Sequence, residues 1–493
     1  MKNRRLFFSY TLLCVLILFS QCKNKQHVED SEFSLISTAI SNTGSKHYFN
    51  PGQYPVERSE LAIGVFDSGT GGLSVLNSII ELDEFNNSSH EPGSDGIADF
   101  ISERFIYLAD EANMPYGKYN AEGKADFLRE LVLKDVLFLL GNSYYSSPQD
   151  RMPKKDKGAV KSIVIACNTA TAYGLETVRD AMNDWDLDIE ILGIIEAGAK
   201  NAIELLSGRG KDKSVIGVLA TEGTCASGGY PASILKIAKH QIPEADIMVV
   251  QQAGIGLAGA IDEDINYIDP SASEIRDAQL YYGPGIDHSD YPIDLTLWDK
   301  YNFKTGNGLL IERDEQGEIT RIQINSVLNY IRYMLTHLVI KSSSDYPDYS
   351  LDAVILGCTH YPYFESDIRE HLLFLKQLDE KYERIIPENI ALINPAQSLA
   401  IELYKDLVSS DLTGKDHYKN SSFFISVPNS LLKENNINEL GEFPYSWKYG
   451  REINSSLQYV KVLPFSDQWI DANIRMRIKQ NLLSTYNIIY PEI

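Results

Sequence analysis

The chain has 493 residues, of which 44% are hydrophobic, and its 45 basic and 68 acidic residues give a formal net charge of −23. This length and composition are sufficient for a packed core in two or more domains. The acidic balance excludes an extended nucleic-acid-binding surface, because phosphate binding requires clustered cations. A small acidic substrate is not excluded, since a local pocket can carry the opposite charge.

The first 22 residues are typical of a targeting segment. Three of the first five residues are basic, and an apolar run follows from Leu6 to Phe19. That run is short for a membrane-spanning helix and has the flanks of an export signal. Cys22 comes shortly after it, as in a bacterial lipoprotein, so residues 1–22 predict a signal peptide with Cys22 as the lipidated residue. A cleaved secretory signal and an uncleaved anchor are the alternatives.

Residues 23–54 are polar and lack periodicity, which predicts a flexible tether between the lipid and the fold. We therefore expect an exported, membrane-anchored lipoprotein that faces the periplasm or the cell surface. Three cysteines follow this segment, and an odd number is a poor disulfide framework in an exported protein.

The stretch at residues 61–76, LAIGVFDSGTGGLSVL, predicts a buried strand, a glycine-rich turn and the start of a helix. This is the unit of a parallel α/β sheet, in which ligands bind beyond the carboxyl ends of the strands. Asp67 and Ser68 therefore lie where chemistry is expected. The glycines allow a ligand to approach the backbone, and N–H groups at a helix start favour an anion such as a carboxylate. Taken alone, this turn is equally compatible with a plain connection or a nucleotide site.

Two later stretches each run from a buried strand into a cysteine. Residues 162–174 read SIVIACNTATAYG and contain Cys167, and residues 352–362 read DAVILGCTHYP and contain Cys358. Cys167 and Cys358 are interpreted as catalytic thiols. The alternative interpretations are that both are small buried apolar side chains or that they form a disulfide. The sequence also has internal similarity, because SVIGVLATEGT at residues 214–224 is similar to LAIGVFDSGTG. The chain therefore predicts an α/β fold of two similar lobes, each with a mainly parallel sheet flanked by helices, whose strand ends face a shared cleft.

Helices and surface additions complete the pattern. Apolar stripes predict core-packing helices at Ala125–Leu140 and Val327–Leu338, the second capped by Asn325 or Ser326. Four polar stretches are predicted to be solvated additions to the core: residues 83–103, 141–161, 262–321 and 411–454. A partner-docking role stays open for residues 262–321. Residues 411–454 contain a predicted strand at Phe423–Val427.

These stretches, taken together and in this order, resemble the glutamate racemase family within the aspartate/glutamate racemase superfamily. Further motifs carry the resemblance: YLAD at residues 107–110, PYG at 115–117, GIIEAG at 193–198 and GVLATEGTCASGGY at 217–230. It covers about residues 61–407 in ordered motifs. The resemblance implies a first lobe of residues 55–197 and 362–493 and a second lobe of residues 198–361. The second lobe carries the insertion at about 262–321, and the active site lies in the cleft between the lobes.

The resemblance assigns Cys167 and Cys358 as the two acid/base residues of a racemase. It places Asp67 as an assisting group near Cys167, and Glu222 and His360 as assisting groups near Cys358. Inverting Cα requires removing a proton from one face and delivering one to the other, which two groups on opposite faces achieve. The expected substrate contacts are Asp67, Ser68, Pro115, Tyr116, Gly117, Asn168, Thr169, Thr359 and His360.

Two thiols outside the cytoplasm raise the question of their redox state. A substrate between them keeps Cys167 and Cys358 farther apart than the roughly 7 Å between Cα atoms that a disulfide allows. We therefore expect both thiols to be free in the resting fold. Cys225, in the segment TCAS, is interpreted as a structural residue.

The implied function is cofactor-independent interconversion of L- and D-glutamate, with a small acidic amino acid as substrate and no metal. The sequence carries no dinucleotide fingerprint or Walker-type phosphate loop, and no lysine stands out as a pyridoxal phosphate site. An aspartate or related racemase and a non-catalytic acidic-amino-acid-binding lipoprotein are the alternatives, and a homodimer stays open. A cytoplasmic racemase of this family supplies D-glutamate for the peptidoglycan of the cell wall, whereas an exported one can act on amino acids released by wall turnover.

Overall fold

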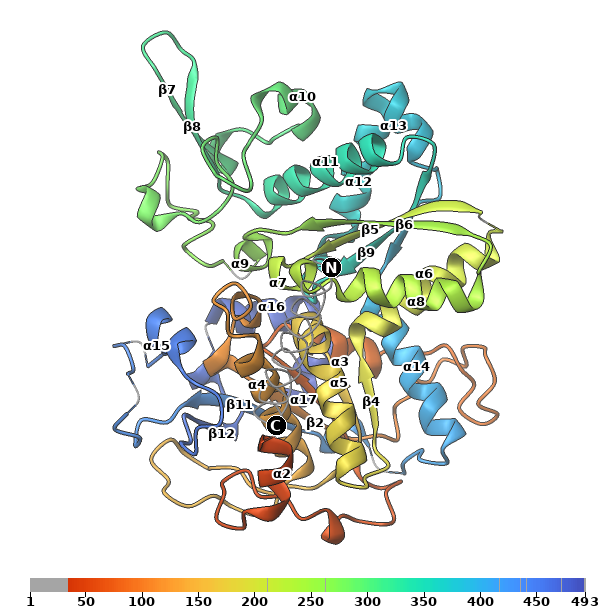
Figure 1. The fold of residues 1–493 in the computed structure, drawn as a ribbon, viewed down its shortest axis with the longest axis vertical. Helices are drawn as coiled ribbons and strands as arrows, with labels where there is room; N and C mark the ends of the chain where they lie inside the picture. The colour runs from red at the N-terminus through yellow and green to blue at the C-terminus, as the bar shows by residue number, and fades with distance from the viewer. Residues whose placement is uncertain are drawn as a thin grey trace, which may run out of the picture.

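The computed structural model describes residues 34–491, apart from residues 211, 262, 416, 435, 440 and 471. The predicted signal peptide, the lipidation of Cys22 and the start of the predicted tether lie outside the described residues. In the part of the chain that is described, no helix is both long and apolar enough to cross a membrane. The chain forms two lobes, one above the other (Figure 1).

The first lobe is built on a six-stranded sheet with the order β12-β11-β2-β1-β3-β4. Its strands are β1 Ala62–Asp67, β2 Phe105–Ala109, β3 Val160–Ile165, β4 Glu190–Gly193, β11 Ser422–Pro428 and β12 Val460–Pro464. Every pair is parallel except β11 with β12. The predicted strand at Phe423–Val427 is confirmed as β11, whereas β12 was not predicted.

The second lobe is built on a four-stranded parallel sheet with the order β10-β9-β5-β6. Its strands are β5 Lys213–Ala220, β6 Asp246–Ala253, β9 Ser350–Gly357 and β10 Ala391–Ile393. Two lobes with mainly parallel sheets confirm the predicted fold class. The apolar runs of the inner strands β1, β2, β3, β5 and β9 are buried, because helices cover each face of a parallel sheet.

Helices lie on both faces of each sheet. Those of the first lobe are α2 Ser34–Ser41, α3 Leu73–Ile80, α4 Ala125–Leu140, α5 Asn168–Asp184, α14 Pro395–Ser409, α15 Tyr445–Gly450, α16 Ala472–Asn481 and α17 Leu483–Ile489. Those of the second lobe are α6 Ile194–Gly208, α7 Glu222–Ser227, α8 Gly229–Gln241, α9 Leu257–Ile261, α10 Trp298–Tyr301, α11 Val327–Asp345, α12 Glu365–Leu378 and α13 Glu380–Ile385. Both predicted core helices are confirmed, as α4 and α11, and Ser326 caps α11 by accepting from the Asn329 N–H.

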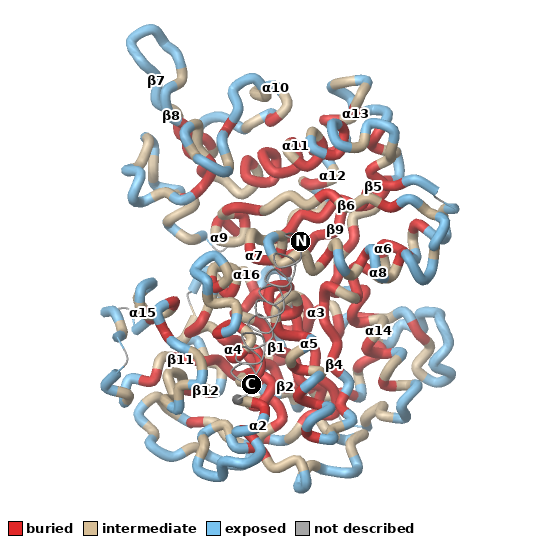
Figure 2. Tube along the Cα trace, in the orientation of Figure 1, coloured by how far each residue is buried: buried red, intermediate tan, exposed pale blue. Residues whose placement is uncertain are grey.

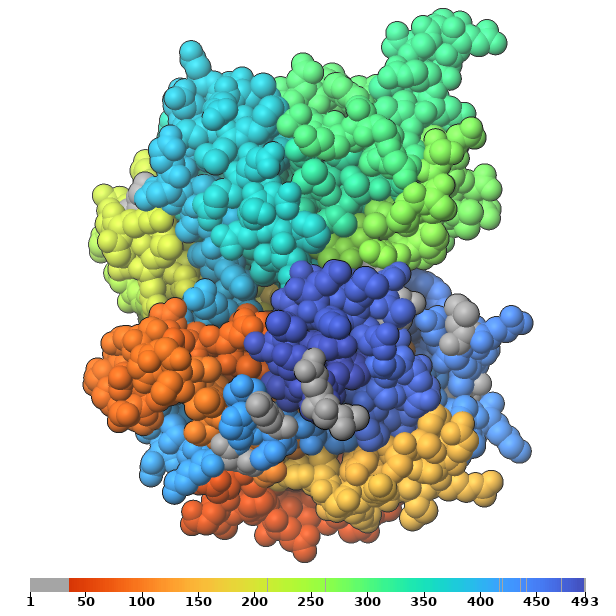
Figure 3. All heavy atoms as spheres, turned by 180° about the vertical axis from the view of Figure 1, so that it is seen from behind, coloured from red at the N-terminus to blue at the C-terminus, as the bar shows by residue number. Residues whose placement is uncertain are grey.

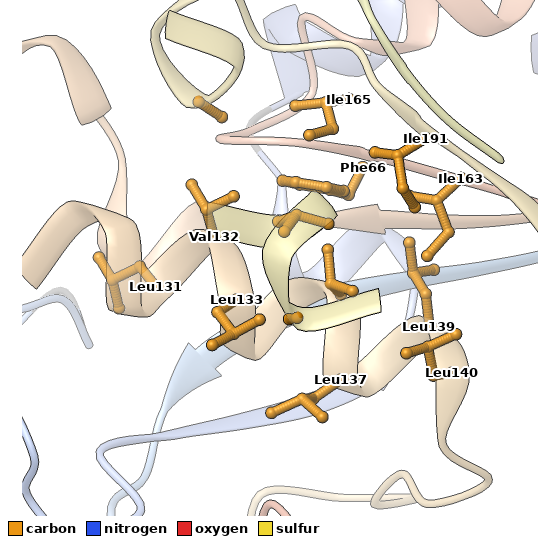
Figure 4. Close-up of a cluster of buried hydrophobic side chains, with 14 of the residues drawn as sticks. Phe66, Leu131, Val132, Leu133, Leu137, Leu139, Leu140, Ile163, Ile165 and Ile191 are labelled. Carbon is orange, nitrogen blue, oxygen red and sulfur yellow. The ribbon is translucent and has the colours of Figure 1, made fainter. Parts of the chain in front are cut away.

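Successive side chains of β1 point to opposite faces of the first sheet. Phe66 packs in one core with α4 and α5, where Val132, Leu139 and Ile163 surround it (Figure 4). Ile63 packs on the other face, in a core with α3, α14 and α17. Strand β1 is therefore held from both sides, which fixes the position of Asp67 at its end.

The chain returns to the first lobe later than predicted. The prediction placed the boundary at residues 361 and 362, but β10 pairs with β9 in the second sheet. Helices α12 and α13 also pack on the second-lobe core through Ile368, Leu372 and Ile385. The return is made by α14, which packs against both α3 and α6. A three-residue strand carries too little local pattern to be assigned to a sheet from sequence.

Part of the predicted tether is packed on the first lobe, which corrects the prediction for residues 34–54. Ile36 and Ala39 of α2 are buried in the first-lobe core. The Trp185 indole N–H donates to the Ile36 carbonyl at 3.0 Å, and the Tyr54 hydroxyl donates to the Val160 carbonyl at 2.5 Å. Few, scattered apolar residues make these contacts, so no periodicity marked the segment.

The insertion that follows β6 is only partly solvated. Its hairpin, β7 Leu309–Arg313 and β8 Ile319–Ile324, projects from the second lobe with an exposed tip (Figures 1 and 2). Its base is buried, because Ile293, Tyr301 and Ile324 pack into the second-lobe core beside α11. The prediction of a purely solvated addition is therefore wrong for this base.

The C-terminal helices lie on the first lobe, directly below the second lobe when the molecule is seen from behind (Figure 3). Ile478, Leu482 and Ile488 pack with α3 in the first-lobe core. Arg477 of α16 donates to the Ile261 carbonyl of the second lobe at 2.8 Å. These helices therefore pack on the first lobe and contact the second.

Candidate active site

Asp67 ends β1 and holds the glycine-rich turn that follows it. Its carboxylate accepts from the N–H groups of Gly72 at 2.9 Å and Gly69 at 3.2 Å. The Tyr107 hydroxyl, from the neighbouring strand β2, donates to the Gly69 carbonyl at 2.7 Å and holds the turn in place. Burial raises the pKa of Asp67, while the Gly72 N–H and the charge of His360 act in the opposite direction. Asp67 is therefore a buried carboxyl whose protonation is sensitive to the other lobe.

Cys167 follows β3 and caps helix α5. Its sulfur accepts from the Ala170 N–H at 3.4 Å and lies 3.7 Å from the Ser68 hydroxyl. Burial, and next the nearby Asp67 carboxylate, raise the pKa of this thiol to about 12. Asp67 thus lies near Cys167, as expected, and Ser68 lies beside the same thiol. Burial and the Asp67 charge favour a protonated Cys167 near neutral pH.

Cys358 follows β9, the equivalent position in the second lobe. Its sulfur lies 3.5 Å from Nδ1 of His360, and the Thr359 hydroxyl lies 3.5 Å from the same nitrogen. An imidazole at this distance can take the proton of a thiol and leave a thiolate. The CTH segment therefore brings its three predicted site residues together as a thiol, a hydroxyl and a base.

The glycine-rich turn of the first lobe lies directly against the CTH segment of the second. A Cβ on Gly71 would lie 2.6 Å from Cε1 of His360 and 2.7 Å from the Thr359 hydroxyl oxygen, so only glycine fits. The Ser74 hydroxyl donates to the Thr359 carbonyl at 2.9 Å. A cavity of about 170 Å³ between the lobes reaches Cys358 and Thr359 at this contact.

Tyr230 links the two cysteine segments and was not predicted as a site residue. Its buried hydroxyl donates to Oδ1 of Asn168 at 2.7 Å, which leaves the Asn168 amide N–H groups as the donors of that side chain. A Cβ on Gly357 would lie 2.9 Å from Cε2 of the same ring. Tyr230 therefore contacts the residue after Cys167 and the residue before Cys358. Tyr230 is the last residue of the motif at residues 217–230, and its place in that motif was the only feature of the sequence that pointed to a role in the site.

Thr169 faces the second lobe beside this tyrosine. Its hydroxyl lies 3.3 Å from the Thr224 hydroxyl of α7, and the Thr221 hydroxyl donates to Thr224 at 2.9 Å. The hydroxyl of Thr169 is therefore committed to an inter-lobe contact.

Glu222 begins α7 and is half-buried. Nζ of Lys118, from the first lobe, lies 3.2 Å from its carboxylate. Tyr291, from the insertion, also has a side-chain hydrogen bond to Glu222, and burial followed by this carboxylate raises the pKa of Tyr291. Neither partner was predicted, because Tyr291 stands in a tyrosine-rich insertion and Lys118 lies just beyond the PYG motif.

Tyr116 differs from its predicted role. Its side chain is buried, and its hydroxyl bonds to the carboxylates of Asp110 at 2.5 Å and Asp135 at 2.7 Å. Burial and the Asp110 charge hold the pKa of Asp135 well above its usual range, so the network retains a proton. The Tyr116 side chain is therefore committed to the first-lobe core, so Tyr116 can meet a ligand only through its backbone.

The three described cysteines are free thiols. The predicted free state of Cys167 and Cys358 is therefore present in this structure. The Cys225 sulfur lies 3.9 Å from the Ala220 carbonyl, and burial raises the pKa of this thiol to about 12. Cys225 packs on β5, in keeping with its interpretation as a structural residue.

The raised pKa of Asp67 predicts a pH-dependent stability effect. The folded protein binds this proton more tightly than the unfolded chain, so stability falls as the pH rises through the folded-state pKa. The Asp67→Asn variant stays neutral and can still accept from Gly72. We expect its melting temperature to exceed that of the wild type by about 2 °C at pH 8, with no gain at pH 4. Calorimetry at the two pH values measures this difference, and an equal gain at both would contradict the buried-charge explanation.

Comparison with known proteins finds many similar sequences. The glutamate racemase of Trichodesmium erythraeum is 24% identical over 388 residues, which cover 79% of this chain and 94% of that protein. The glutamate racemase of Pseudomonas syringae pv. tomato is 26% identical over 375 residues, covering 76% and 89%. That of Limosilactobacillus fermentum is 34% identical over 204 residues, covering 40% and 58%. No protein-family model matches the chain.

Solved structures of similar proteins include two glutamate racemases. The RacE1 isoform from Bacillus anthracis has a TM-score of 0.42 at 22% identity and covers 74% of this chain and 88% of its own. The enzyme from Thermus thermophilus, solved with beta-chloro-D-alanine, has a TM-score of 0.40 at 23% identity and covers 75% and 88%.

Proposed function

Because this chain belongs to the glutamate racemase family, we propose that it interconverts L- and D-glutamate, with Cys167 and Cys358 as the two acid/base groups. One observation carries the proposal. Two free, buried thiols end equivalent strands of two lobes, and each has a titratable neighbour, Asp67 or His360. A binding protein needs no such pair.

The surroundings of the two thiols suggest their starting protonation states. The pKa of Cys167 is raised to about 12 by burial and by Asp67, so this thiol is the acid. Nδ1 of His360 lies 3.5 Å from the Cys358 sulfur and is placed to accept its proton, so we assign Cys358 as the base. Each cysteine therefore begins turnover in a different state, as inversion requires.

In turnover, the Cys358 thiolate removes the proton from Cα, and the electron pair of the C–H bond moves into the substrate α-carboxylate. That electron pair then returns to Cα and forms a new C–H bond with the proton of the Cys167 thiol on the opposite face, which leaves Cys167 as a thiolate. Thiol and thiolate have now exchanged places, which is the state that the reverse reaction needs. Preorganised donors lower the cost of the developing charge, and the Asn168 amide and the N–H groups of the β1–α3 turn are suited to this task.

The proposal is tested by incubating the purified chain from residue 23 onward with L-glutamate, and separately with L-aspartate, under reducing conditions in D2O. We expect the circular dichroism of L-glutamate to decay to zero, and the product to carry deuterium at Cα. A constant signal with both amino acids, from protein that is folded by its own circular dichroism, would contradict racemase activity. Decay with aspartate alone would reassign the substrate.

A further inference from the structure

A short C-terminal segment grips the loop that carries the PYG motif. Three side chains from residues 448–451 bind three successive residues of that loop. Nζ of Lys448 donates to the Met114 carbonyl at 2.5 Å, and the Tyr449 hydroxyl donates to the Pro115 carbonyl at 3.2 Å. Arg451 donates to Oδ1 of Asn113 at 2.6 Å. We call Lys448, Tyr449 and Arg451 the loop clamp.

The loop clamp is itself firmly held. Only 4% of Arg451 is exposed, and its guanidinium lies 5.2 Å from the ring of Phe127 and 4.6 Å from that of Phe443. The Tyr449 ring meets the Tyr119 ring edge to face, with centroids 4.7 Å apart. Arg451 also donates to the Tyr119 hydroxyl at 3.2 Å. Buried aromatic contacts of this kind leave little freedom for the donors, so the loop carbonyls meet a rigid surface.

The other end of the same loop meets the second lobe at Glu222. A Cβ on Gly223 would lie 2.6 Å from the Gly117 carbonyl oxygen, so the two backbones touch. The next loop residue, Lys118, forms its ion pair with Glu222 at 3.2 Å. A displacement of the loop at residues 113–115 therefore changes the contact that Gly117 and Lys118 make with α7.

We propose that Lys448, Tyr449 and Arg451 are positioning residues, which set the distance between the PYG loop and Glu222 in the closed active site. The inference rests on the proposed racemase function of this site. It gives a role to the polar addition at residues 411–454, which the sequence predicted to be a solvated elaboration. The loop clamp acts on substrate binding through the loop, because no clamp donor bonds to either cysteine or to its neighbouring base.

When the loop clamp is weakened, part of the free energy of substrate binding is used to order the PYG loop. An enzyme whose binding-competent state is only partly populated binds its ligand more weakly by that fraction. The chemical step, once the loop is closed, uses the same two thiols. The expected signature is a raised KM with little change in kcat, whereas a loss of folded protein lowers the apparent kcat and leaves KM unchanged.

The test compares Lys448→Met and Tyr449→Phe, singly and combined, with two matched controls. Tyr445→Phe removes a hydroxyl from the same helix, whose hydrogen-bond partner among the described residues is the exposed Glu122 side chain. Lys433→Met removes an exposed cation from the same addition. We expect the double variant to raise KM for L-glutamate about fivefold to twentyfold with kcat within about twofold. Lys448→Arg, which keeps a donor, is expected to recover most of the affinity.

Hydrogen–deuterium exchange of a peptide covering residues 113–119 provides a second readout. We expect exchange about tenfold faster in the double variant and unchanged in both controls. Unchanged exchange overturns the clamp, and faster exchange with an unchanged KM overturns its role in substrate binding. If the wild type does not racemise glutamate, the proposed function fails separately, and the exchange measurement still decides whether these side chains position the loop.

Discussion

Replacing Cys167 or Cys358 by serine is expected to reduce racemisation about a thousandfold or more in both directions. A serine hydroxyl is far less acidic than a thiol, so it can neither form the anion that abstracts the Cα proton nor supply a matched acid. Loss of one general acid or base typically costs a factor of 10² to 10⁴. Because each turnover uses one group on each face, either substitution blocks both directions.

The measurement is the initial rate with L- and with D-glutamate, together with deuterium incorporation at Cα in D2O. Cys225→Ser is the matched control, because Cys225 is also a free thiol but is only partly buried and lies against the Ala220 carbonyl. It is expected to retain at least about half of the wild-type rate. Full activity of either the Cys167 or the Cys358 variant would rule out a two-thiol mechanism.

Substituting alanine for Gly223 is expected to lower kcat/KM about a hundredfold while the protein remains folded. The new Cβ would lie 2.6 Å from the Gly117 carbonyl oxygen and 2.7 Å from its Cα, which are backbone atoms and cannot rotate away. The two lobes must therefore separate at the point where Lys118 meets Glu222. A displacement of about 1 Å in a catalytic arrangement is sufficient for a loss of this size.

Gly208→Ala is the matched control for this substitution. Gly208 ends α6, and a Cβ there meets nothing within 4 Å. Alanine in a helix is favoured over glycine by roughly 0.5–1 kcal/mol, so this variant is expected to be slightly more stable and fully active. Steady-state kinetics and thermal melts of both variants make the comparison. A Gly223→Ala enzyme with wild-type kcat/KM would show that the contact between Gly117 and Gly223 is not needed for turnover.

Local patterns predicted those parts of the fold whose signal lies within one element. Helix α4 was predicted at its observed bounds, because apolar residues recur along Ala125–Leu140 at the helical spacing. The strands that lead to Asp67, Cys167 and Cys358 each contain an apolar run that is buried in the sheet, as expected of strands covered on both faces. The residues of strand β10 were assigned to the wrong lobe, because three residues contain too little pattern to predict which strand they pair with.

The site was predictable where chemistry follows directly from a strand end, and not where it depends on packing between distant segments. Cys358 and His360 are two residues apart, so their meeting could be expected from sequence. Tyr291 reaches Glu222 from a segment about 70 residues away, and no local pattern marks it. The partners of the Tyr116 hydroxyl could not be predicted for the same reason, because Asp110 and Asp135 are brought to it by the fold of the first lobe.

The strand order of the first sheet has a consequence for synthesis on the ribosome. Strand β2 pairs with β1 on one side and with β11 on the other, and β11 begins at Ser422, more than 300 residues after β2. Until that segment emerges, one side of β2 presents unpaired backbone groups, the feature of a strand that invites wrong partners. The second sheet has no such delay, because its strands lie between Lys213 and Ile393 in one continuous piece. During translation the second lobe can therefore complete its sheet first. The sheet of the first lobe is completed only after β11 and β12 have been synthesised.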